Sequence, residues 1–226
     1  MAECDGVEDE EVSWGSSMKI KRLAAIAAVG IASMIAGSWA ASAAAEPIRI
    51  VAFGGSSTYG KGVDRQDTYP AQLERALRAK GYDVTVANAG VNGETTKDAL
   101  SRFDRAVPAG TAIVILEFGL NDRFANVNPD VIRANLDTLL TRLQERHIQT
   151  LLIGYAGGSG LETLAEKHNA TFMTFAFPGG NDAKYRVSND PQLQAKGIAH
   201  FNRQGYEMVV QKMTPLVEVL IPRVTH

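Results

Sequence analysis

Short apolar runs alternate with longer amphipathic segments from residue 48 onward. The runs are almost continuously apolar, which is typical of strands buried on both faces of a parallel sheet. They are IRIVAF (48–53), DVTVANA (83–89), TAIVILEF (111–118), TLLIGYA (150–156) and TFMTFAF (171–177). The pattern therefore predicts a five-stranded parallel sheet.

The segments between the runs carry helical signals. Asn128 is a capping residue, Pro129 follows it, and leucines then recur at helical spacing. Pro70 opens a similar segment, and a third begins at Asn202. Strands and helices in alternation predict an α/β protein, a three-layer α/β/α sandwich that forms one domain over residues 46–226.

Residues 18–45 have the features of a secretory signal peptide. Basic residues precede an alanine-rich apolar run, which ends in small residues with A-x-A spacing. We therefore expect cleavage after Ala43 or Ala45 and a periplasmic or secreted domain. An uncleaved membrane anchor is the alternative, because the run over residues 23–41 approaches the length that spans a bilayer.

Residues 1–17 contain six acidic side chains and no basic one, which is the wrong charge for a segment that precedes an export signal. We interpret them as a mis-assigned N-terminal extension, with translation starting at Met18. The chain has one cysteine, Cys4, so the domain from residue 46 has no disulfide and no thiol nucleophile. The 23 basic and 25 acidic residues of the full chain leave no basic surplus for nucleic acid.

The stretch FGGSSTYGKG (53–62) includes the end of the first apolar run and is compatible with either a phosphate-binding loop or a turn that presents a nucleophile. Gly55 to Lys61 match the first seven positions of the phosphate-binding pattern G-x-x-x-x-G-K-[ST]. The eighth position is Gly62, which has no hydroxyl to ligate magnesium, and ATP is scarce outside the cytoplasm. We therefore expect no nucleotide partner and favour the alternative, a turn that presents a serine nucleophile.

Polar residues follow the predicted strands, where ligands of open α/β sheets bind. A serine becomes nucleophilic when a base takes its proton, and histidine is the usual base near neutral pH. The tetrahedral intermediate also needs hydrogen-bond donors for its oxyanion. One complete set consists of Ser56, Gly93, Asn121 and His200.

This order and spacing resembles the SGNH hydrolase (GDSL esterase) superfamily, in its thioesterase I, lysophospholipase and arylesterase branch. Ser56 in GGSS matches the nucleophile, and His200 in AHFN matches the base. Gly93 in NAGVNGETT and Asn121 in GLND match the oxyanion-hole residues, with the Ser56 amide as a further donor. The resemblance implies a flavodoxin-like fold and hydrolysis of carboxylic esters or thioesters through an acyl-serine, without a cofactor or a metal.

The chain departs from the family pattern at two aspartates. The G-D-S of the family has Gly55 in place of its aspartate, and the D-x-x-H pattern has Gly197 where the acid of the triad is expected. Asp190 and Asp182 are candidate substitutes, and a main-chain carbonyl that orients His200 is another. Disabling the triad aspartate of a serine protease costs about 10⁴-fold in turnover, so a Ser-His pair with an intact oxyanion hole still catalyses.

Two alternatives to the esterase hypothesis stay open. A carbohydrate O-deacetylase would use the same groups, and a non-catalytic binding module would keep the fold without the chemistry. The expected partner is a small-molecule ester, namely an acyl ester, a lysolipid or an acetylated glycan, with a membrane involved only if the leader stays uncleaved. His147 and His168 have no second ligand at metal spacing, so we interpret both as solvated residues late in helices and expect no metal site.

Overall fold

The structure is a computed structural model of the chain, and it describes residues 46–155, 160–175, 182–187 and 199–224. The predicted signal peptide at residues 18–45 and the extension before it lie outside these ranges and stay predictions. Among the described helices, none combines the length and the apolar character needed to cross a membrane.

A parallel sheet of five strands forms the centre of the domain, in the order β2-β1-β3-β4-β5. The strands are β1 (Ile48–Gly54), β2 (Val84–Gly90), β3 (Ile113–Glu117), β4 (Gln149–Gly154) and β5 (Thr171–Thr174). This is the flavodoxin-like order, so the predicted fold class is confirmed. Each strand begins within two residues of the start of its apolar run. The strands β3, β4 and β5 end before their runs do.

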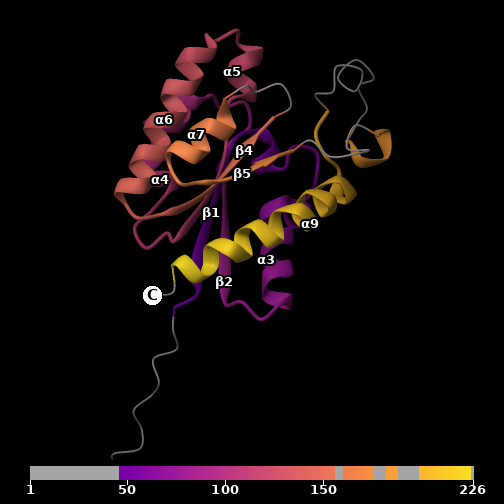
Figure 1. The fold of residues 1–226 in the computed structure, drawn as a ribbon. Coiled ribbons are helices and arrows are strands. Elements are labelled where there is room, and N and C mark those ends of the chain that lie inside the picture. The colour runs from indigo at the N-terminus through magenta and orange to yellow at the C-terminus, as the bar shows by residue number, and fades with distance from the viewer. Residues whose placement is uncertain (1–45, 156–159, 176–181, 188–198, 225–226) are drawn as a thin grey trace, which may run out of the picture. The chain divides into compact units, whose positions relative to one another are not determined.

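Helices cover both faces of the sheet (Figure 1). One face carries α3 (Tyr69–Ala79) and α9 (Arg203–Leu220), and the other carries α4 (Thr96–Ala106), α6 (Pro129–Glu145) and α7 (Leu161–Lys167). Alternate residues of β1 serve the two layers, since Ile50 packs in the α3 and α9 core and Val51 in the α4 and α6 core.

Short elements complete the described part of the domain. They are the helices α2 (Ser56–Tyr59) and α5 (Leu120–Phe124) and the 3₁₀ turns η1 (Arg65–Asp67), η2 (Ala183–Tyr185) and η3 (Ile221–Arg223). Both α2 and α5 directly follow strands of the central sheet. They therefore lie at the edge of the sheet where the sequence predicts the site.

Helix starts follow the local sequence signals. The Asn128 side chain accepts a hydrogen bond from the N–H of Asp130 at 2.8 Å, and Pro129 opens α6 as predicted. Asn202 caps α9 in the same way, accepting from the N–H of Gly205 at 3.0 Å. The third predicted helix, α3, begins one residue before Pro70.

Candidate active site

Ser56 and His200 meet at the carboxyl edge of the sheet. Ser56 is the first residue of α2, directly beyond β1, and His200 precedes α9. His200 Nε2 lies 2.8 Å from Ser56 Oγ although 144 residues separate them in sequence. The neighbouring Ser57 is buried, and its Oγ lies 3.4 Å from the hydroxyl of Tyr155. The structure therefore brings together the predicted nucleophile and base, and it distinguishes Ser56 from Ser57.

The predicted oxyanion donors lie beside the nucleophile. A Cβ added to Gly55 would be 3.0 Å from Nδ2 of Asn121 and 3.7 Å from the carbonyl oxygen of Glu94. That carbonyl accepts a hydrogen bond from Asn121 Nδ2 at 2.8 Å, which joins α5 to the loop of Gly93. Gly93 has a φ of +86°, and no described atom lies within 4 Å of the position that its Cβ would take. The loop of Gly93 and the helix of Asn121 therefore meet beside the turn that carries Ser56.

A known protein family matches most of the domain. The model of the GDSL-like lipase/acylhydrolase family matches residues 52–208, which include the predicted nucleophile, the predicted oxyanion residues and the predicted base. The chain belongs to this family.

Relatives of this GDSL-like chain include esterases. An arylesterase of Vibrio mimicus is 32% identical over 107 residues, which are 47% of this chain and 52% of that protein. Esterase TesA of Pseudomonas aeruginosa is 29% identical over 113 residues, 50% of this chain and 55% of that protein. The chain thus spans about half the length of the curated relatives that it matches.

A solved structure extends the similarity over most of the domain. AlinE4, an SGNH-hydrolase family esterase, is 32% identical with a TM-score of 0.55, and the match covers 76% of this chain and 96% of AlinE4. The predicted membership of the SGNH hydrolase superfamily is confirmed.

The side chains of Asp122 and Glu94 tie the predicted oxyanion-hole residues of this GDSL-like domain to α4. Asp122, only 1% exposed, accepts hydrogen bonds from the N–H of Thr96 at 3.0 Å and from its hydroxyl at 2.5 Å. This contact fixes α5, which carries Asn121, to the start of α4. Glu94 accepts from Nε of Arg102 at 2.6 Å, so the loop after β2 is fixed to α4 as well.

The backbone beside His200 pairs with a distant segment. Val187 N–H donates to the carbonyl of His200 at 2.8 Å, and Nη1 of Arg186 donates to the carbonyl of Ala199 at 2.8 Å. The guanidinium of Arg186 also lies 3.9 Å from the centre of the Phe201 ring. These contacts orient the segment that carries the base.

The surroundings of His200 favour its neutral form. Burial, together with the positive charges of Lys61 and Arg186, lowers the pKa of His200 from 6.5 to about 4. The imidazole is therefore neutral at neutral pH and able to accept the proton of Ser56.

The third member of the triad stays a prediction. Asp190 and Gly197 lie outside the described residues. Asp182, the other candidate, is exposed at the N-terminal end of η2, and it is not among the groups that shift the pKa of His200.

A buried carboxylate that is not among the predicted site residues lies beside the turn of Ser56. Glu117 is the last residue of β3, is 2% exposed, and accepts hydrogen bonds from the N–H groups of Gly55 and Thr58. Its signal in the sequence is a single charge within the apolar run TAIVILEF. Such a charge in a buried strand needs partners, and here they are backbone groups on both sides of Ser56.

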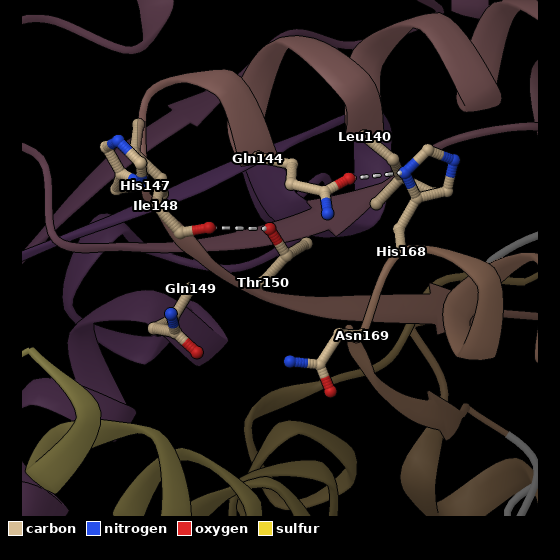
Figure 2. A pocket seen from close by; sticks show the side chains of 8 residues that line it. All are labelled: Leu140, Gln144, His147, Ile148, Gln149, Thr150, His168 and Asn169. Carbon is tan, nitrogen blue, oxygen red and sulfur yellow. Dashed lines mark hydrogen bonds between the residues drawn. The ribbon is translucent and has the colours of Figure 1, made fainter.

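A small cavity of about 150 Å³ lies at the opposite edge of the sheet (Figure 2). Its lining residues are Leu140, Gln144, His147, Ile148, Gln149, Thr150, His168 and Asn169. Gln149 and Thr150 begin β4, so this cavity is at the amino ends of the strands and Ser56 at the carboxyl end of β1. It is therefore separate from the catalytic groups.

The prediction that His168 is solvated is wrong. Its side chain is 6% exposed, with Nε2 2.6 Å from Asp137 Oδ1 and Nδ1 3.2 Å from Gln144 Oε1 (Figure 2 shows the second contact). The reason is that the end of α7 packs against α6, which supplies both acceptors. In the described parts of the chain, no group of three His, Cys, Asp or Glu side chains is arranged to hold a metal ion.

Proposed function

We propose that this domain is a serine hydrolase of carboxylic esters or thioesters that acts through an acyl-serine intermediate. The observation that carries the proposal is the 2.8 Å contact between Ser56 Oγ and His200 Nε2, next to a turn whose Gly55 has the side-chain amide of Asn121 beside it. The esterase names of the relatives support the same reaction class.

The geometry supports the following sequence of steps. Ser56 Oγ attacks the acyl carbon while His200 Nε2 accepts its proton. The N–H groups of Ser56 and Gly93 and the Asn121 amide donate to the oxyanion that forms. His200 then protonates the leaving alcohol or thiol, and the resulting acyl-serine is hydrolysed by water that the same imidazole deprotonates.

Exposed apolar side chains favour an apolar acyl or aryl ester over a glycan. Tyr59, Val91 and Phe124 are 50%, 41% and 52% exposed, and each belongs to one of the three loops that carry the nucleophile and the oxyanion donors. Single exposed apolar residues are common on proteins. Here Tyr59 follows Ser56 by three residues, Phe124 follows Asn121 by three, and Val91 precedes Gly93 by two. A substrate bound at the site therefore meets apolar surface.

We also infer that the protein is exported. The inference rests on the basic, apolar and A-x-A regions of residues 18–45. Expression in a bacterium followed by N-terminal sequencing of the periplasmic protein tests it. A mature chain that begins at residue 44 or 46 is expected, and an intact leader in the membrane fraction would contradict cleavage.

Hydrolysis of a graded series of p-nitrophenyl esters, beside acetylated xylan, tests the proposed activity. The full chain is expected to hydrolyse the esters, and Ser56→Ala to lose more than about 10³-fold in kcat. Ser57→Ala is the matched control, because it removes the adjacent hydroxyl, and it is expected to stay within about threefold of the parent. Equal rates for the parent and Ser56→Ala would refute the proposal, and preference for xylan acetate would identify a deacetylase.

A further inference from the structure

The environment of Glu117 is unusual because the hydrogen-bond donors around it belong mainly to the nucleophile turn. Its Oε2 accepts from the N–H of Gly55 at 3.2 Å, from the N–H of Thr58 at 3.2 Å and from the Thr58 hydroxyl at 2.7 Å. Its Oε1 accepts from the hydroxyl of Tyr155. Gly55 and Thr58 flank Ser56 and Ser57, so one carboxylate holds the turn from both ends.

The hydrogen positions around the carboxylate follow from the donor inventory. The hydroxyl of Thr58 has one hydrogen, which it donates to Glu117, so its contact with Tyr69 Oη at 3.0 Å has Tyr69 as the donor. The four hydrogens that reach the carboxylate all point toward it, and the Tyr69 hydrogen points toward Thr58. Such an arrangement fits an ionised carboxylate, which only accepts, whereas a protonated acid would require one of the hydroxyls to turn away.

The chain accommodates this group by the absence of a side chain at residue 54. A Cβ on Gly54 would lie 2.1 Å from Oγ1 of Thr58 and 2.7 Å from Oε2 of Glu117. Any larger residue would displace the carboxylate or the turn. The absence of a side chain at Gly54 therefore allows the contact between Glu117 and the turn of Ser56.

We propose that Glu117 is a positioning residue for the reaction: its ionised carboxylate fixes the backbone on both sides of Ser56 and so holds Oγ within reach of His200. This inference rests on the proposed function, because it assumes that Ser56 is the nucleophile. Glu117 does not contact the reacting atoms. Its effect reaches them through the position of the turn, where small displacements of a nucleophile lower turnover strongly.

A pH dependence follows from this role. Burial raises the pKa of Glu117 to about 7. The titratable groups that face it among the described residues are the phenols of Tyr69 from α3, Tyr206 from α9 and Tyr155 after β4. Burial raises the pKa of Tyr69 and of Tyr206, so neither ionises in this range. As the pH falls through about 7, Glu117 gains a proton, one hydroxyl must turn away, and kcat decreases. The pKa of His200 is about 4, so its own titration falls well below this range.

Steady-state kinetics of the full chain between about pH 4.5 and pH 9 test the proposal. Glu117→Gln keeps the shape of the side chain and removes the charge. At pH 8 its kcat is expected to be lower by between about tenfold and a hundredfold, with KM changed by less than about threefold. Its pH profile is expected to lack the acidic limb near pH 7 that the parent shows.

A variant with an ordinary loss of stability serves as the control. Thr214 is buried in α9, and its hydroxyl donates to the carbonyl of Val210 at 2.7 Å, away from the nucleophile turn. Thr214→Val is expected to lower the melting temperature while kcat and the limb near pH 7 stay unchanged. The positioning role is overturned if Glu117→Gln behaves like this control, that is, if its melting temperature falls while kcat and the acidic limb near pH 7 are retained.

A second variant keeps the proposal testable if Glu117→Gln does not fold. Tyr155→Phe removes one donor to the carboxylate and so disfavours its ionised form, which is expected to shift the acidic limb to higher pH. An unshifted limb overturns the proposal. Labelling of the parent by a fluorophosphonate separates this failure from a failure of the proposed function, because an unlabelled Ser56 in the parent contradicts the serine hydrolase itself.

Discussion

The two halves of the candidate site are built differently. The nucleophile half takes Ser56, Gly93 and Asn121 from loops that follow three neighbouring strands, and buried side chains such as Glu117 join these loops to the sheet and to α4. The base half takes His200 from a segment before α9 that pairs with residues around Arg186.

The two halves are held in place by different kinds of interaction. The nucleophile half depends on hydrogen bonds from buried polar side chains, so a single substitution there leaves a buried group without its partner. The base half depends on backbone pairing and on one stacked guanidinium. We therefore expect substitutions in the nucleophile half to lower turnover more than those in the support of the base.

Removing an oxyanion donor is expected to have the largest effect. Asn121→Ala deletes the amide that lies beside Gly55. A loss of about 10² to 10³-fold in kcat is expected, with little change in KM, because the donor acts on the transition state. Ester hydrolysis kinetics measure it, and an effect confined to KM would assign Asn121 to substrate binding instead.

The two halves are expected to show opposite pH dependence of stability. The pKa of Glu117 is raised from 4.5 to about 7, so the folded state binds this proton more tightly, and the free energy of unfolding decreases as the pH rises through that interval. The change amounts to about 3 kcal/mol at most. The pKa of His200 is lowered from 6.5 to about 4, so its contribution to the free energy of unfolding increases as the pH rises from 4 to 6.5.

Substitution separates these two opposing contributions. In Glu117→Gln the contribution of His200 remains, so the free energy of unfolding of this variant is expected to increase as the pH rises from 4 to 6.5. In His200→Gln the contribution of Glu117 remains, so the free energy of unfolding of this variant is expected to decrease as the pH rises from 4.5 to 7. Urea denaturation at a series of pH values measures both, and parallel slopes in the two variants would contradict the assignment.

A backbone substitution tests the role of Gly93 with a matched control. Gly93→Ala forces an alanine to a φ of +86°, which strains the amide that donates to the oxyanion. A loss of about tenfold in kcat is expected. Gly81 has a φ of +91° and equally open surroundings beyond the end of α3, so Gly81→Ala imposes similar strain away from the site and is expected to leave kcat unchanged.

The smallest effect is expected at the support of the base. Arg186→Met removes the hydrogen bond to Ala199 and a positive charge near the imidazole. The pKa of His200 is therefore expected to rise from about 4 toward its ordinary value, and kcat to fall only about threefold. A nuclear magnetic resonance titration of His200 measures the shift, and an unchanged pKa would show that the cation has no influence there.

The placement of the nucleophile half at one edge of the sheet could be predicted because its signals are local. Apolar runs located the strands, and residues directly after them are brought to one edge by any parallel sheet. The position of Ser56, Gly93 and Asn121 at this edge could therefore be predicted without knowledge of the contacts between distant segments. His200 was found through its resemblance to the family pattern before the last helix.

Other features depend on contacts between distant segments. The pairing of Val187 with His200 and the stacking of Arg186 on Phe201 leave no periodic pattern in the sequence. Glu117 is a single charge within the apolar run TAIVILEF, so the run predicts a buried strand and gives no sign of the donors that this carboxylate contacts. His168 was predicted to be solvated because its acceptors lie on another helix.

Fluorophosphonate labelling of the full chain, followed by peptide mass spectrometry, tests whether Ser56 and His200 form the catalytic centre. A single adduct on Ser56 is expected, which disappears in Ser56→Ala, persists in Ser57→Ala and forms much more slowly in His200→Gln. A label on Ser57, or no adduct on Ser56 in the folded parent protein, would contradict the Ser56 and His200 pair as the catalytic centre.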